Sequence, residues 1–64
     1  MKRGYERFAE LLEKKKLTAY HVALECGVST ATLSNWKHGN YKPKADKLVR
    51  IADYLQVDVR ELLD

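Results

Sequence analysis

Apolar residues recur every three or four positions in two segments of the chain, residues 5–16 and 44–55. This spacing places them on one face of a helix, where they can be buried together. The apolar residues of these two faces are Phe8, Leu11 and Leu12 in the first segment and Leu48, Ile51, Ala52 and Leu55 in the second. No run alternates apolar and polar side chains with period two, which is the pattern of a half-buried strand. The pattern therefore predicts an all-α chain with helices over both segments.

Three more helices are predicted from a shared pattern at their starts, which reads LTAYHV, VSTATL and VDVREL. In each, an apolar residue is followed by a polar one, and a second apolar residue comes four positions after the polar residue. Thr18, Ser29 and Asp58 can each accept a hydrogen bond from a backbone N–H of the first turn. The flanking apolar residues can pack together as a hydrophobic staple, and Glu61 adds the partner of a capping box. The predicted ranges are about 18–26 for the second helix and about 29–38 for the third, with a fifth helix after Asp58.

Very little chain joins the second and third predicted helices. Gly27 can adopt the left-handed conformation that ends a helix, and Ala23, one turn earlier, is small enough for two helices to cross closely. On the third helix, Leu33 and Trp36 share one side and are expected to face the core rather than a ligand. These features are typical of a helix-turn-helix, although a tight corner between any two helices has them as well.

Composition and charge narrow the class of protein. A chain of 64 residues, 45% hydrophobic and 33% charged, suits one globular domain, residues 1–64, with a small core. No apolar run is long enough to cross a membrane, and a single cysteine excludes an internal disulfide. The net charge is only +3, but residues 26–45 contain no Asp or Glu and include three lysines, Lys37, Lys42 and Lys44. Chance clustering and a surface for an anionic partner both account for this distribution.

The order and spacing of these elements resemble the Cro/repressor, or XRE-like, helix-turn-helix family of bacterial and phage regulators. The matching residues are Leu17, Thr18, Val22, Ala23, Gly27, Val28, Ser29, Leu33, Trp36, Gly39, Pro43, Leu48, Ile51, Ala52, Leu55, Val57, Glu61 and Leu62. Ala19 and Ala31 depart from the family, which often has polar residues there. The resemblance implies a compact five-helix domain of the phage-repressor type. It also implies a cytoplasmic, sequence-specific DNA-binding transcription regulator of bacterial or phage origin, with repression as the expected role.

The third predicted helix has the composition of a major-groove reader. Short side chains at its front allow close approach to the groove, Asn can pair with two atoms of adenine, and Ala or Thr methyls can contact thymine. The expected base-reading residues are Thr30, Ala31, Ser34 and Asn35. The expected phosphate contacts, several of them in a loop that the resemblance identifies as contacting the DNA backbone, are Ser29, Lys37, His38, Asn40, Tyr41, Lys42 and Lys44. An exposed polar face without a partner is the alternative interpretation.

Catalytic and metal-binding chemistry is not predicted. The two histidines and the one cysteine lack zinc-site spacing, and no nucleophile pairs convincingly with a base. We therefore expect no enzyme activity, no metal and no cofactor. The expected partner is double-stranded DNA, bound on paired half-sites by a weak homodimer that uses the last helix, with Leu63 and Tyr54 in its surface. The alternative is a protein-interaction module on the same fold, such as an antitoxin or adaptor.

Overall fold

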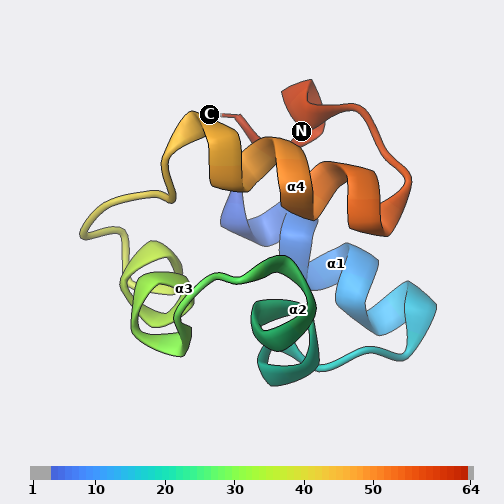
Figure 1. The fold of residues 1–64 in the computed structure, drawn as a ribbon, viewed down its shortest axis with the longest axis horizontal. Helices are drawn as coiled ribbons and strands as arrows, with labels where there is room; N and C mark the ends of the chain where they lie inside the picture. Colours follow the sequence, from blue (N-terminus) through green and yellow to red (C-terminus); the bar gives the residue numbers. More distant parts are fainter. Residues whose placement is uncertain (1–3, 64) are drawn as a thin grey trace.

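The computed structural model describes residues 4–63 as four α-helices followed by one turn of 3-10 helix. The elements are α1 (Tyr5–Lys15), α2 (Ala19–Cys26), α3 (Thr30–Lys37), α4 (Ala45–Leu55) and η1 (Val59–Leu62). No strand occurs within residues 4–63. In the view of Figure 1, α2 and α3 occupy the lower half of the molecule and α4 crosses the upper half. The all-α prediction and the positions of the first four helices are confirmed.

The prediction of a fifth α-helix is wrong, because the segment after Asp58 forms only the 3-10 turn η1. The Arg60 N–H donates to the Asp58 carboxylate at 2.8 Å, and the Glu61 N–H donates to the Asp58 carbonyl at 2.9 Å, which is 3-10 spacing. The expected capping box is wrong as well, because the Glu61 carboxylate accepts from Arg7 Nε at 2.7 Å instead. Leu62 is fully buried. Packing of Leu62 and the ion pair to α1 therefore determine the path of this segment.

The side-chain caps predicted for α2 and α3 are confirmed. Thr18 Oγ1 accepts from the His21 N–H at 3.1 Å, and Ser29 Oγ accepts from the Thr32 N–H at 3.0 Å. Each bond satisfies one of the backbone donors that a helix start leaves without an intrahelical acceptor. The two short helices are therefore delimited by local chemistry at residues that the sequence pattern had marked.

Gly27 ends α2 in the left-handed conformation, with φ of +68°. The Val28 N–H then donates back to the Ala23 carbonyl at 3.0 Å, which closes the helix end. A Cβ added at Gly27 would lie 3.9 Å from an Arg50 side-chain atom, so space does not require glycine here. The backbone conformation does, since a side chain at this φ is strained. Only Val28 lies between this glycine and the cap of α3, which keeps α2 and α3 adjacent.

The core gathers the apolar faces of all five elements. α4 packs against α2 and η1, while α1 packs against α3 and η1. Trp36 is 5% exposed, and its ring centroid lies 5.1 Å from that of Phe8 and 5.4 Å from that of Tyr5. The buried apolar residues are Phe8, Leu11, Leu12, Val22, Ala23, Cys26, Val28, Leu33, Trp36, Leu48, Ile51, Ala52, Leu55 and Leu62. The predicted inward orientation of Leu33 and Trp36 is confirmed, so the opposite side of α3 faces outward.

Candidate nucleic-acid interface

The exposed side of α3 carries short polar and small side chains. Thr30, Ala31 and Ser34 are exposed, and Asn35 is partly exposed. Leu33 and Trp36 hold the other side of the helix in the core. A helix with two large buried anchors and a low, polar outer surface can approach another molecule closely along its backbone. The structure thus brings the four expected base-reading residues together on one surface.

The start of α3 presents backbone donors as well as side chains. Ser29 Oγ lies 2.9 Å from Thr32 Oγ1 and accepts from the Thr32 N–H, so the Ser29 hydroxyl is already engaged in the cap. By helix geometry, the N–H groups of Thr30 and Ala31 have no acceptor within the helix. These N–H groups and the positive end of the helix dipole are suited to an anionic partner. At this position the backbone is therefore better placed than the Ser29 side chain to contact a phosphate.

The end of α3 is closed by His38. Its ring Nδ1 lies 2.8 Å from the Ser34 carbonyl oxygen, and its backbone N–H donates to the same oxygen at 3.1 Å. A carbonyl oxygen can only accept, so Nδ1 carries a hydrogen in this arrangement. His38 is thus held against the end of α3 by its ring and by its backbone.

A hydrogen-bond network ties the loop after α3 to the helix. Asn35 Nδ2 donates to the Ala31 carbonyl at 2.9 Å and to the Tyr41 hydroxyl at 3.1 Å. Asn40 donates twice to Asn35, from Nδ2 to Oδ1 at 2.9 Å and from its backbone N–H to the Asn35 carbonyl at 2.9 Å. We name Asn35, Asn40 and Tyr41 the Asn35 network. The network places the loop beside the exposed face of α3, where both can reach one ligand.

The loop presents cations around this network. Lys42 and Lys44 are exposed, while Pro43 between them is buried and anchors the loop. Lys37, Tyr41 and Lys42 line a shallow groove together with Tyr5 and Glu6 of α1. Three of the expected phosphate contacts therefore lie together beside the end of α3. Glu6, which the sequence pattern did not mark, is an acidic neighbour of these residues.

A second groove separates the first turn of α2 from α3. Its walls include Ala19 and Tyr20 from α2 and Thr30, Ser34 and Lys37 from α3, and Tyr5 of α1 also lines it. The volume of this groove is about 340 Å³. Tyr5 was missed by the sequence reasoning, since its place in the first turn of α1 says nothing about distant neighbours. An aromatic residue ahead of the buried face of α1 was the only signal that could have marked it.

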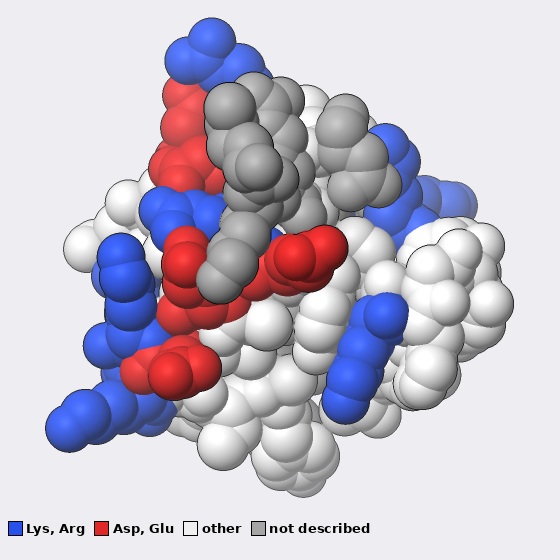
Figure 2. Space-filling view, turned by 180° about the vertical axis from the view of Figure 1, so that it is seen from behind, with Lys and Arg blue, Asp and Glu red and all other residues white. Residues whose placement is uncertain are grey.

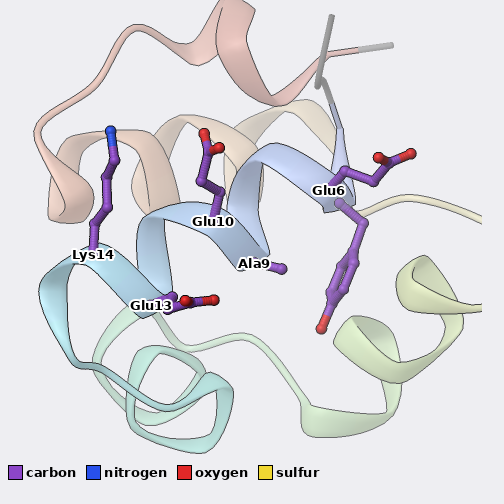
Figure 3. Close-up of a pocket in the computed structure, with 6 residues that line it drawn as sticks. Glu6, Ala9, Glu10, Glu13 and Lys14 are labelled. Atoms are coloured by element: carbon purple, nitrogen blue, oxygen red, sulfur yellow. The ribbon is translucent and has the colours of Figure 1, made fainter.

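The acidic residues gather in one part of the face that Figure 2 shows, whereas Lys and Arg occur in both. Figure 2 shows acidic residues in the left half and centre of the face drawn there, whereas the right part, where α3 lies, is white and blue. Glu6, Glu10 and Glu13 line a hollow along α1 with Lys14, and Figure 3 shows their side chains on one side of this helix. Among residues 4–63, no three His, Cys, Asp or Glu side chains cluster so that they could hold a metal ion. The polar face of α3 and its loop, which carry exposed lysines and no acidic residue, suit a polyanion.

The comparisons with known proteins agree with this geometry. The helix-turn-helix family model, of the Cro/repressor or XRE type, matches residues 8–62, which is most of the chain. The chain therefore belongs to this family, which is a family of DNA-binding domains and not of enzymes. No curated protein and no solved structure matches the chain. In the part of the chain that the structure describes, no helix has the length and apolar character needed to cross a membrane.

Proposed function

We propose that this protein is a sequence-specific regulator of transcription, and specifically a repressor, that places α3 in the major groove of double-stranded DNA. One observation carries the proposal: the small polar face of α3 adjoins a loop of exposed lysines within residues 26–45, a stretch without any acidic residue. A recognition helix needs short side chains on its outer face so that it can approach base edges. It also needs neighbouring cations that bind the phosphates. A bacterial or phage origin and a cytoplasmic location belong to the same proposal.

The proposed contacts divide into two groups. Thr30, Ala31, Ser34 and Asn35 meet base edges, because they form the exposed side of the helix. The residues proposed to contact phosphates are Ser29, Lys37, His38, Asn40, Tyr41, Lys42 and Lys44. Ser29 acts through the helix start that it caps, and Asn40 acts through the Asn35 network. One α3 helix covers only a few base pairs, so we further propose a weak homodimer on paired half-sites.

Binding to random duplex DNA at two salt concentrations tests the proposal. Each phosphate neutralised by a cation releases counterions, so affinity falls steeply as salt rises. With about four such contacts, a fourfold rise in salt should weaken binding about 150-fold. Selection of bound sites from random DNA should then yield a motif of two half-sites. Absence of duplex binding at low salt would refute the proposal.

A protein-interaction module is the second candidate function. Tyr20 and Leu24, four residues apart on α2 and therefore on the same face of it, are 64% and 63% exposed. Such a pair can contact an apolar partner. Absence of salt-sensitive DNA binding, together with a protein complex that Leu24→Ser abolishes, would support this candidate instead.

A further inference from the structure

Asn35 has little hydrogen-bonding capacity left for a ligand. An asparagine side chain offers two N–H donors and two acceptor positions on its oxygen. Both donors are used, on the Ala31 carbonyl at 2.9 Å and on the Tyr41 hydroxyl at 3.1 Å. One acceptor position of Oδ1 is used by Asn40 at 2.9 Å. Only one acceptor position remains, so Asn35 cannot form the two-bond pair with adenine unless the network breaks.

The orientation of the Asn35 amide is set by its surroundings. The Ala31 carbonyl can only accept, so the nitrogen of the amide, and not its oxygen, must lie toward it. Oδ1 then lies toward Asn40, whose Nδ2 donates to it. A flipped amide would place Oδ1 against the Ala31 carbonyl oxygen and break this bond and the bond from Asn40.

Tyr41 completes the arrangement. Its hydroxyl accepts from Asn35 and keeps its own hydrogen for another acceptor. The Tyr41 side chain is 54% exposed, so that acceptor can belong to a ligand. A phosphate oxygen satisfies this donor and would hold the Tyr41 hydroxyl in place. The phosphate contact of Tyr41 and the base contact of Asn35 are then coupled through one hydrogen bond.

We infer that Asn35 reads DNA as an acceptor only, and that Tyr41 is the positioning residue that imposes this role. In the major groove, an acceptor recognises the exocyclic amino group of adenine or of cytosine. Guanine and thymine present only acceptors at the corresponding edge. The inference rests on the proposed function and specifies it: the column of the DNA motif under Asn35 accepts adenine and cytosine alike and disfavours guanine and thymine.

The test compares the wild-type protein with Tyr41→Phe on four duplexes that differ only at one base pair. That base pair is the motif column that Asn35→Ala flattens in a selection from random DNA. For the wild-type protein we expect affinities for adenine and cytosine within about threefold of each other, and about tenfold weaker binding to guanine and thymine. Tyr41→Phe frees one N–H of Asn35, so this variant should prefer adenine over cytosine by about tenfold. Lys14→Ala is the control, because it changes a side chain of α1 that lines neither groove beside α3, and it should leave the column unchanged.

The outcomes separate this inference from the proposed function. The wild-type protein could instead select adenine alone, with the same base preference in Tyr41→Phe. This result would show that Asn35 breaks its network to make the two-bond pair. It would overturn the inference while leaving DNA binding intact. A selected motif that Asn35→Ala leaves unaltered would overturn it as well. Failure to bind any duplex would overturn the proposed function together with the inference. Tyr41 is exposed, so Tyr41→Phe should melt like the wild-type protein, which circular dichroism can verify.

Discussion

Replacement of Trp36 by alanine should unfold this protein at room temperature. Trp36 lies on the buried side of α3, is 5% exposed, and packs its ring against Phe8 and Tyr5 of α1. Removing a buried tryptophan side chain typically costs about 3–5 kcal/mol in the free energy of unfolding. The two lost aromatic contacts, one of them edge-to-face, contribute about 0.5–1.5 kcal/mol each beyond buried area.

The free energy of unfolding of the whole domain is no larger than this loss. A single core in a domain of this size rarely supplies more than about 3–5 kcal/mol of net stability. The loss expected from Trp36→Ala therefore equals or exceeds the whole stability of the domain. Because Trp36 joins α3 to α1, its removal also detaches α3 from α1.

Thermal and urea unfolding followed by circular dichroism provide the assay. Trp36→Ala should lack a cooperative transition at 25 °C and above, whereas the control Tyr20→Ala, which truncates a 64% exposed aromatic, should melt near the wild-type temperature. A cooperative melt of Trp36→Ala close to the wild type, with only DNA binding lost, would refute the reasoning. It would show that Trp36 acts on the ligand and not on the core.

Three other predictions concern a loop lysine, the pair of Asp58 and Arg60, and the dimer interface. Lys42→Ala should weaken binding to all duplex sequences alike and lower the slope of log affinity against log salt concentration by about one unit per subunit. The control Lys14→Ala, on the acidic side of α1, should change neither quantity. Equal effects of the two variants would place the DNA elsewhere. The hydrogen bonds from Arg60 lower the pKa of Asp58 to about 2, so the stabilisation from ionised Asp58 is present above pH 4 and lost as the pH falls through about 2. Asp58→Asn should therefore narrow the difference in melting temperature between pH 5 and pH 2, and an unchanged difference would argue against this pair. The protein should sediment as a monomer at micromolar concentration without DNA and as a dimer on paired half-sites. Tyr54→Ala should weaken the dimer on paired half-sites and leave the monomer unchanged. A stable dimer without DNA would contradict a weak interface.

The helix starts and the buried faces can be predicted from the order of residues alone. Thr18 and Ser29 cap their helices through bonds that span three residues, and Leu33 and Trp36 lie one turn apart on the buried side of α3. Such features depend on chemistry within one turn of backbone, so the order of residues shows them directly. The expected base-reading residues share one surface for the same reason.

Features that depend on partners far away along the chain could not be predicted in this way. Glu61 binds Arg7, 54 positions away along the chain, and the last segment forms a 3-10 turn where local patterning predicted an α-helix. Tyr5 reaches the grooves beside α3 only because α1 packs against that helix. Both amide hydrogens of Asn35 are engaged because the loop folds back and brings Tyr41 to the amide. Local spacing shows which face of a helix a side chain occupies, but the donors and acceptors that meet it there depend on how the chain closes around it.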